Sequence, residues 1–389
     1  MPPRVAILPP VPVPYREPLF RALAERGRIN PYVLYLSASQ PGWDQPSGWF
    51  SEAHGYGSEI LSAWQRQRAG RAPVSVARGL GGALTSARPD CVVSWEYGPA
   101  TLRALAWTRR RRVPLVVFSE LTPWSEDGLS SFQRRVHRLL APRVGGFIVA
   151  SSQGAERLRS LGVEPGRVEV ALQSIDAATV GPAGERPAEG RPAGPVRILA
   201  VGRLVPDKNL GALISAFGEA GFGEVEAELE IRGTGPLEAE LRARAEGLGL
   251  PVRFPGPAPP GELGAVYAAA DALALVSTYE PFGVTLREGA AAGLPLIASR
   301  RAGAVGDIAI EGENAIVIDP DDLGQIAAAL RRLVREPELR ERLAAGSRAV
   351  SERHPPEADA EAWERAILRA ANSEGSDPLS APDSRGQTP

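Results

Sequence analysis

Short runs of β-branched and other apolar residues recur along this chain, and segments of helical periodicity separate them. In the first half these runs are residues 4–8, 32–36, 91–94, 115–118 and 147–150. In the second half they are residues 196–201, 227–231, 272–276, 295–298 and 315–318. Strand-like runs that alternate with helical segments predict βαβ units and a parallel sheet. The pattern therefore predicts an α/β protein with two Rossmann-like halves.

Glycine and proline dominate residues 179–195, which can hold neither a helix nor a central strand. We interpret residues 177–195 as a linker between a first domain, 1–176, and a second domain, 196–355. Open α/β sheets bind ligands beyond the carboxyl ends of their strands, so both halves are expected to face a central cleft with their loops. A late helix at 356–371 is expected to cross back to the first domain. The Ser, Gly and Pro-rich tail at 372–389 is expected to be disordered.

Composition narrows the class of protein. The 389 residues are 43% hydrophobic and 23% charged, with a net charge of −2, as in a soluble globular protein. The N-terminus turns into a strand pattern too early for a signal peptide, and no apolar run is long enough to span a bilayer. We therefore expect a cytoplasmic protein. Cys91 is the only cysteine, which excludes an internal disulfide, and its apolar neighbours indicate an inert buried thiol.

The net charge hides an asymmetry between the two halves. Residues 1–176 hold 22 arginines against 14 acids, a balance of +8, whereas the remainder has a balance of −10. The basic residues include the run 109–112 and the helical pattern Arg134, Arg135, Arg138 and Arg143. Two interpretations stay open: a solvated helix face, or attraction to an anionic membrane surface or an anionic acceptor.

Lys208 is the only lysine, although lysine and arginine together number 44. It lies in the segment 201–209, directly after the predicted strand 196–201, with Arg203 five residues before it. An ammonium is a compact point charge that suits a phosphate oxygen, whereas guanidinium is a planar fork. Arg203 and Lys208 together could therefore hold a diphosphate from two sides.

A second constellation occupies residues 280–295. Small and apolar residues at 284–292 predict a helix, Gly293 fits its left-handed cap, and Gly283 lies at its start, where the backbone allows close approach of a ligand. The free N–H groups of the first turn would form a phosphate site. Glu280 and Glu288 flank this site and could accept hydrogen bonds from sugar and ribose hydroxyls.

These residues resemble glycosyltransferase family 4, whose members are retaining enzymes with the two-domain GT-B fold. Residues 201–209 match the family's "VGRL…KN" element, and 280–288 match its "E-x-FG-x-x-x-x-E" element. Further elements follow in the family's order: Gly233-Thr234-Gly235-Pro236, Phe254-Pro255-Gly256, Tyr267, Ala270-Asp271-Ala272 and a "GG-x-PE-x-I" element with Asp307 for the usual Glu. In the first half, 12–20 and 151–162 also fit the family.

The resemblance implies transfer of a sugar from a nucleoside-diphosphate sugar of UDP or GDP type to an acceptor hydroxyl. Arg203 and Lys208 would stabilise the leaving diphosphate, Glu280 would hold sugar hydroxyls and Glu288 ribose hydroxyls. The other donor contacts would be Gly233, Pro257, Phe282, Gly283, Val284 and Thr285. No cofactor, metal or nucleic acid is implied. The acceptor would be a glycan, a lipid-linked molecule or a small molecule, in cell-envelope glycan, glycolipid or secondary-metabolite synthesis.

One departure concerns the acceptor side. Many family members carry a histidine in the loop after the strand that corresponds to 115–118, where this chain has Ser119 and Glu120. His54, His137 and His354 lie elsewhere in the sequence. Glu120 or Ser119 could substitute as the group near the acceptor hydroxyl. The alternatives are a non-catalytic sugar-nucleotide-binding protein and a sugar-nucleotide epimerase of related fold.

Three weaker signals also need an interpretation. Gly233-x-Gly235 begins like a dinucleotide fingerprint, but position 238 is Glu, so a dehydrogenase is disfavoured. The acids at 319–322 precede a helical segment, and Asp321 or Asp322 is expected to cap it rather than bind a metal. Trp43, Trp49 and Trp124 could form an aromatic acceptor surface.

Overall fold

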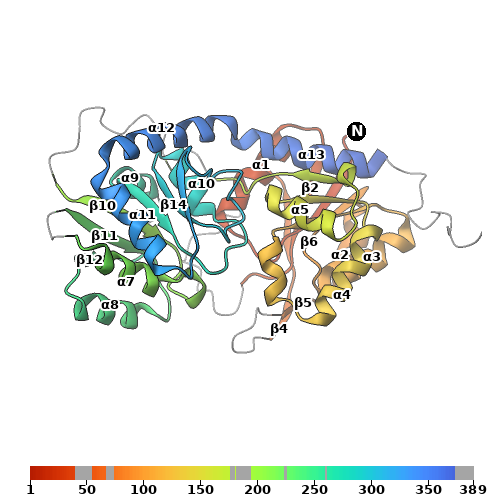
Figure 1. The fold of residues 1–389 in the computed structure, drawn as a ribbon. Coiled ribbons are helices and arrows are strands. Elements are labelled where there is room, and N and C mark those ends of the chain that lie inside the picture. The colour runs from red at the N-terminus through yellow and green to blue at the C-terminus, as the bar shows by residue number, and fades with distance from the viewer. Residues whose placement is uncertain are drawn as a thin grey trace, which may run out of the picture. The chain divides into compact units, whose positions relative to one another are not determined.

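The computed structural model describes residues 1–39, 55–66, 74–175, 180, 194–222, 226–258 and 261–372 (Figure 1). The chain divides into two compact units. Unit 1 comprises Met1–Ala150, Gly154–Leu172 and Glu357–Pro389, and unit 2 comprises Ser151–Gln153 and Gln173–Pro356. Most of the predicted linker, nearly all of the predicted tail, His54, Trp43 and Trp49 lie outside the described residues. Within the described residues, no helix has the length and apolar character that a bilayer crossing requires.

Unit 1 is built on a seven-stranded parallel sheet with the order β3-β2-β1-β6-β7-β8-β9. Its strands are β1 (Arg4–Leu8), β2 (Asn30–Tyr35), β3 (Gly57–Ile60), β6 (Cys91–Trp95), β7 (Leu115–Ser119), β8 (Gly146–Val149) and β9 (Val168–Val170). A separate antiparallel hairpin pairs β4 (Ala63–Arg66) with β5 (Val74–Ala77). The central strands β6, β7 and β8 are buried along their whole length, as expected for a parallel sheet covered on both faces.

Helices cover the sheet of unit 1. They are α1 (Glu17–Glu25), α2 (Leu80–Ala87), α3 (Pro99–Arg111), α4 (Ser131–Leu140), α5 (Ser152–Ser160) and α13 (Pro356–Asn372), with short 3₁₀ turns η1 (Pro14–Arg16), η2 (Pro123–Gly128), η3 (Ala141–Arg143) and η4 (Pro165–Arg167). The last helix, α13, comes back to unit 1 from the far end of the sequence. Its Trp363 is 1% exposed and packs against the rings of Phe20, Trp95 and Phe118. The predicted crossover helix is therefore confirmed.

Unit 2 contains a six-stranded parallel sheet with the order β12-β11-β10-β13-β14-β15. Its strands are β10 (Val196–Val201), β11 (Ala227–Arg232), β12 (Val252–Arg253), β13 (Ala272–Leu275), β14 (Leu296–Ser299) and β15 (Ala315–Ile318). Strand order reverses between β10 and β13, which are neighbours in the sheet but far apart in sequence. Open α/β sheets bind ligands at the carboxyl ends of strands beside such a switch point.

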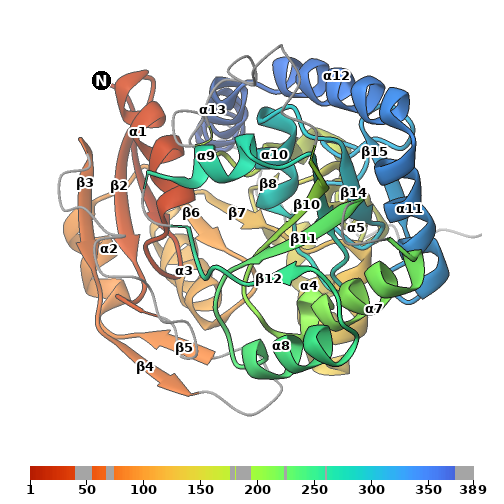
Figure 2. The ribbon, with the colours of Figure 1, turned by 90° about the vertical axis from the view of Figure 1, so that its left-hand side faces the viewer.

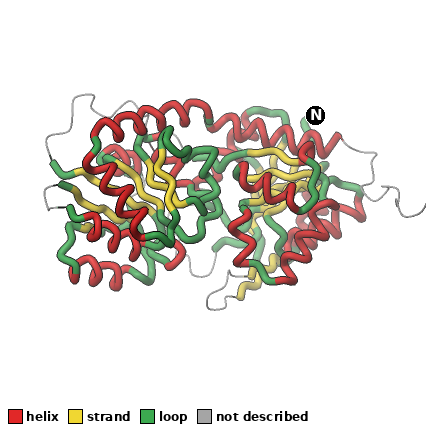
Figure 3. Tube along the Cα trace, viewed as in Figure 1, coloured by secondary structure: helices red, strands yellow, loops and turns green. Residues whose placement is uncertain are grey.

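The helices of unit 2 lie on both faces of its sheet (Figures 2 and 3). They are α7 (Leu210–Ala220), α8 (Glu238–Gly247), α9 (Leu263–Ala268), α10 (Val284–Ala291), α11 (Leu323–Arg335) and α12 (Pro337–Arg353), preceded by the 3₁₀ turn η5 (Pro206–Lys208). Apolar residues of α7, α8 and α11 form one core with β10, β11 and β13. Two Rossmann-like units and a returning C-terminal helix confirm the predicted fold class.

Two local predictions are also confirmed. Cys91 is buried, and burial raises the pKa of its thiol to about 12, so the thiolate is scarce at neutral pH. Asp322 caps α11, because its carboxylate accepts the N–H of Gln325 at 3.0 Å.

Candidate donor-binding site

The loops that follow the strands of unit 2 are tied to one another by their backbones. Gly202 N–H donates to the carbonyl of Arg232 at 2.9 Å, and Leu204 N–H donates to that of Thr234 at 2.8 Å. These bonds join the loop after β10 to the loop after β11. Because parallel strands end at the same edge of a sheet, the loop residues singled out in the sequence come together there.

Two glycines permit this close packing. A Cβ atom at Gly233 would lie 1.8 Å from the carbonyl oxygen of Gly202, and one at Gly235 would lie 2.4 Å from that of Leu204. No side chain fits at either position. Loop packing thus explains the Gly-x-Gly spacing without a dinucleotide-binding turn.

Lys208 and Glu280 form a direct ion pair between the ammonium and Oε2 of the carboxylate. The two side chains are 19% and 11% exposed, and Ser277 Oγ donates to the same carboxylate oxygen at 3.3 Å. The backbone holds the two loops in place, because Thr278 N–H donates to the carbonyl of Asp207 at 2.9 Å. The sequence placed both residues at the donor site but did not predict their contact. Arg203, five residues before Lys208, has an exposed side chain.

Helix α10 begins directly after Gly283, as predicted. Gly283 has φ 99° and is buried, so this position favours glycine, and Gly293 after the helix also has a positive φ of 71°. Phe282, before the turn, is buried, while Val284 and Thr285 of the first turn are partly exposed. No side chain caps this end of the helix. Its first N–H groups, which lack acceptors within the helix, could therefore bind an anion.

Glu288 lies in α10 and accepts a hydrogen bond from the hydroxyl of Tyr267 at 2.5 Å. Burial raises the pKa of Glu288, and the bond from Tyr267 opposes this shift. One carboxylate oxygen can accept more than one hydrogen bond, so the Tyr267 contact fixes Glu288 without using its full capacity. The sequence marked Tyr267 as a family residue but gave no sign of this partner. Pro257, the predicted base contact, is exposed in the loop after β12.

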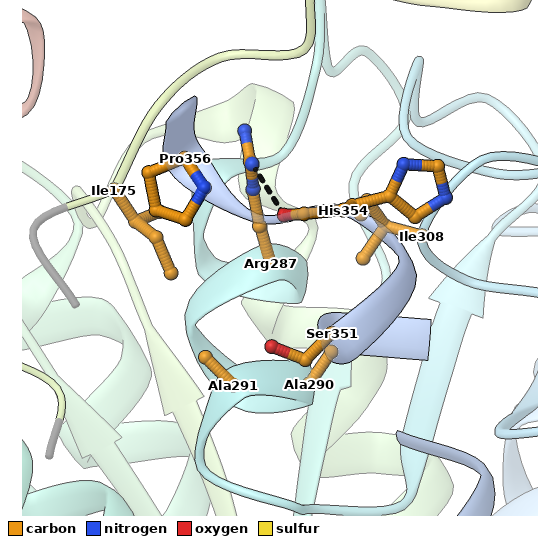
Figure 4. Close-up of a pocket in the computed structure, with 8 residues that line it drawn as sticks. All are labelled: Ile175, Arg287, Ala290, Ala291, Ile308, Ser351, His354 and Pro356. Atoms are coloured by element: carbon orange, nitrogen blue, oxygen red, sulfur yellow. Dashed lines mark hydrogen bonds between the residues drawn. The ribbon is translucent and has the colours of Figure 1, made fainter. Parts of the chain in front are cut away.

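Arg287 lies next to Glu288 and is buried at 3% exposure. Its guanidinium donates to the carbonyl of Gln173 at 2.6 Å. It also donates to the carbonyl of His354 at 2.9 Å (Figure 4). These carbonyls belong to the two segments of unit 2 where the chain passes to and from unit 1. A cavity of about 40 Å³, lined in part by Ile175 and Pro356, adjoins the guanidinium. The helix that carries Glu288 thus also anchors both connecting segments.

We expect Arg287→Met to lower the free energy of unfolding by about 3 kcal/mol. Methionine fills similar space but leaves buried carbonyls without their charged donor, and such groups cost about 1–3 kcal/mol each. Chemical denaturation monitored by circular dichroism measures the change. Arg332→Met, on the exposed face of α11, is the control and should change stability by less than about 0.5 kcal/mol. Equal effects of the two substitutions would contradict the anchoring role.

Glu120 lies in unit 1, immediately after β7, and charged groups surround it. Arg16 donates to its Oε1 at 3.1 Å, and the Arg16 guanidinium lies 4.7 Å from the centre of the Trp95 ring. The Glu120 N–H and the Ser119 hydroxyl both donate to the carboxylate of Glu96, at 2.6 and 2.8 Å. The sequence identified Ser119 and Glu120 but missed Glu96. Its signal was an acid two residues after the predicted run 91–94, as Glu120 lies two residues after the run 115–118.

The described histidines have structural contacts. His137 is buried in α4, stacks on Tyr97 with ring centres 4.3 Å apart, and has Nδ1 2.9 Å from Arg157. Burial lowers its pKa to about 4, so it is neutral at physiological pH. His354 follows α12 in unit 2. In the part of the chain that the structure describes, no three His, Cys, Asp or Glu side chains form a group that could hold a metal ion.

Comparison with known proteins agrees with this architecture. Residues 184–350 match the family model of glycosyl transferases group 1, and residues 12–171 match the glycosyl transferase 4-like domain. The chain is 31% identical over 271 residues to glycogen synthase of Mycobacterium tuberculosis, covering 67% of this chain and 64% of that protein. It is 32% identical over 194 residues to D-inositol 3-phosphate glycosyltransferase of Corynebacterium glutamicum, with 46% of each chain covered. The chain thus spans less than two thirds of these relatives.

Solved structures share the fold. HepE from Anabaena, crystallised with UDP and glucose, superimposes with a TM-score of 0.74 at 18% identity, covering 94% of this chain and 99% of HepE. Sucrose-phosphate synthase from Thermosynechococcus elongatus gives a TM-score of 0.71 at 18% identity, covering 93% of this chain and 98% of that one. Two family models that match the two halves, together with this fold, place the chain in glycosyltransferase group 1, or family 4, with the GT-B fold.

Proposed function

We propose that this protein transfers a sugar from a nucleoside-diphosphate sugar to an acceptor hydroxyl with retention of configuration. The observation that carries the proposal is the Lys208–Glu280 pair, which lies in the same strand-end region as the uncapped N-terminus of α10. One cation and a helix N-terminus suit a diphosphate, and a carboxylate beside them suits sugar hydroxyls. Membership of the family supports the same assignment.

The leaving group is the nucleoside diphosphate, on which negative charge develops as the bond to the sugar breaks. Lys208 and Arg203 would stabilise that charge, and the N–H groups at the start of α10 would add to it. A phosphate oxygen would compete with Glu280 for the ammonium of Lys208. Donor binding would then release the Glu280 carboxylate to accept hydrogen bonds from the sugar. This exchange links occupation of the diphosphate site to recognition of the sugar.

Glu288 would hold the ribose hydroxyls, with Tyr267 fixing its orientation. The backbone near Gly233 and Pro257 would meet the phosphate and the base, and Phe282 would support the turn at Gly283. HepE was crystallised with UDP, so UDP-sugars are the first donors to test and GDP-sugars the second.

The acceptor hydroxyl would attack the anomeric carbon from the side that the diphosphate leaves. One bond from the anomeric carbon to a phosphate oxygen breaks, and one to the acceptor oxygen forms on the same face. Neither Glu280 nor Glu288 acts as a covalent nucleophile in this scheme. Glu120 of unit 1 is the candidate to take the acceptor proton. The acceptor class is a glycan, a lipid-linked molecule or a small molecule of envelope, glycolipid or secondary metabolism.

The test is turnover of UDP- and GDP-sugars with a panel of hydroxyl acceptors, followed by NMR of the product anomer. The proposal expects a glycoside with the donor's anomeric configuration and release of the nucleoside diphosphate. A new sugar nucleotide without such release would indicate epimerisation. Binding without any turnover would indicate a non-catalytic protein.

A peripheral contact with anionic membranes is a second proposal, and a specific surface favours it. Helices α3 and α4 contain no Asp or Glu, and α4 exposes Phe132 at 75% and Leu139 at 51% beside Arg135 and Arg138. Exposed apolar and cationic side chains on one helix suit a lipid interface.

Sedimentation with vesicles of anionic or neutral lipid tests the membrane contact. We expect binding to anionic vesicles that weakens in high salt and falls at least about fivefold in the Phe132→Ser, Leu139→Ser double variant, because it loses two inserted side chains. The control is Leu248→Ser, at a residue of unit 2 that is 53% exposed. Unchanged binding of the double variant would exclude α4 as the contact.

A further inference from the structure

We propose that Glu96 is a positioning residue of the acceptor side: it holds Ser119 and Glu120 so that the Glu120 carboxylate can meet the acceptor hydroxyl. The proposal rests on the function proposed above and adds a residue to it. Glu96 follows β6 and Glu120 follows β7, so neighbouring parallel strands deliver both acids to one edge of the sheet.

The backbone of Glu96 adopts an unusual conformation. Its φ is 51°, in the left-handed region that a non-glycine residue rarely occupies, which costs on the order of 1 kcal/mol. Its N–H donates to the carbonyl of Phe118 at 2.8 Å, which fixes this turn against β7. The turn places the Glu96 carboxylate beside Ser119 and Glu120, the two residues that follow Phe118.

The Glu96 carboxylate engages both residues of the loop. Oε1 accepts the backbone N–H of Glu120 at 2.6 Å, and Oε2 accepts the hydroxyl of Ser119 at 2.8 Å. Arg16 fixes the other end of Glu120 by donating to its Oε1 at 3.1 Å. The Glu120 side chain keeps 20% exposure, so it is held at both ends and still accessible to a substrate.

The surroundings of Glu96 disfavour the ionised form of its carboxyl group. Burial, helped by the negative charge of Glu120, raises the pKa of Glu96 to about 7, although the hydrogen bonds from Glu120 N–H and Ser119 and the charge of Arg157 oppose the shift. Arg157 itself forms an ion pair with Glu126 at 2.6 Å and lies 2.9 Å from Nδ1 of His137. An unfolded glutamate titrates near about 4.3, so the folded state binds this proton more tightly. The ionised carboxylate therefore costs stability as pH rises from about 4.3 to 7.

This cost separates the proposal from a purely structural role. A glutamate that only braced the loop would stabilise the protein in its working form. Here ionised Glu96 accepts both hydrogen bonds, yet the folded protein is less stable above neutral pH, where Glu96 is ionised, than near pH 4, where it is protonated. Glu96→Gln keeps the size of the side chain and replaces one acceptor with a donor, so it mimics the protonated form permanently.

The experiment compares wild type, Glu96→Gln and the control Glu25→Gln, at an exposed position of α1. We expect Glu96→Gln to raise the unfolding temperature by about 3 °C or more at pH 8, with the gain shrinking as pH falls and disappearing below about pH 4. The same variant should lose at least about tenfold in kcat with the KM for donor unchanged, because the donor site is in unit 2. Full activity together with a pH-independent loss of stability would overturn the proposal and leave Glu96 a structural brace.

Three measurements separate failure of this proposal from failure of the proposed function. Amide hydrogen exchange at Glu120 should accelerate at least about tenfold in Glu96→Ala, whether or not the protein transfers sugar, and unchanged exchange would overturn the positioning role. Wild type that binds nucleoside diphosphate but transfers no sugar contradicts the function alone. Glu120→Gln with full activity would contradict the acceptor role of Glu120, and the purpose assigned to Glu96 with it.

Discussion

Replacing Lys208 with methionine is expected to reduce kcat/KM for the sugar-nucleotide donor by about 10²–10³-fold. Loss of one preorganised donor aimed at developing charge costs this much in other enzymes. Lys208 is 19% exposed and paired with a carboxylate that is 11% exposed, so solvent screens its charge only in part. Steady-state transfer or donor-hydrolysis kinetics measure the effect.

Two controls define the interpretation of the Lys208 result. Arg242→Met removes a 45% exposed charge on α8 of the same unit and should leave kcat/KM within about twofold of wild type. Lys208→Arg keeps the charge but replaces a point donor with a planar fork, so partial recovery is expected. A methionine variant as active as wild type would remove Lys208 from the donor site.

Replacing Glu280 with glutamine should separate nucleotide binding from turnover. The substitution removes the carboxylate that pairs with Lys208, so the ammonium becomes free for phosphate, and the nucleoside diphosphate should bind as tightly as to wild type or more tightly. Turnover should fall about 10²–10³-fold, because the charged acceptor for the sugar hydroxyls is lost. Calorimetric titration with UDP or GDP and transfer kinetics give the two quantities.

The Glu280 and Lys208 variants should therefore fail in different ways. Lys208→Met loses both nucleotide binding and turnover, whereas Glu280→Gln loses turnover alone. Ser277, which donates to Glu280 at 3.3 Å, provides a milder comparison, and Ser277→Ala should cost less than about tenfold. If Glu280→Gln retained the wild-type kcat, Glu280 would not be the sugar-binding acid.

Runs of apolar residues and the glycines at helix ends predicted the strands and helices where these patterns were clear. The mainly apolar runs at 4–8, 196–201 and 315–318 are strands with the predicted bounds. Strand β3 escaped prediction because all four of its residues are exposed, and β12 because it has only two residues. The bounds of α10 followed from two glycines, since a positive φ at Gly283 and Gly293 marks both ends of the helix.

Partners distant in sequence could not be predicted in the same way. Lys208 and Glu280 are 72 residues apart, and their pairing depends on how β10 and β13 lie side by side. The contact of Tyr267 with Glu288 joins two helices on one face of the sheet. Glu96 and Glu120 are 24 residues apart on neighbouring strands, and the left-handed turn that brings them together has no glycine to mark it. Sequence patterns report on residues that are close along the chain. These contacts could not be predicted because they join residues that are far apart in sequence.

The central claim is that the strand ends of unit 2 bind a nucleoside diphosphate through Lys208. Its most direct test is the unfolding temperature of wild type and Lys208→Met with UDP and with GDP. A ligand at 100 times its dissociation constant stabilises the folded state by about 2.7 kcal/mol, enough for a clear shift. We expect at least one nucleotide to raise the unfolding temperature of wild type and to leave that of Lys208→Met nearly unchanged. No shift of wild type with either nucleotide, or an equal shift of both proteins, would contradict the claim.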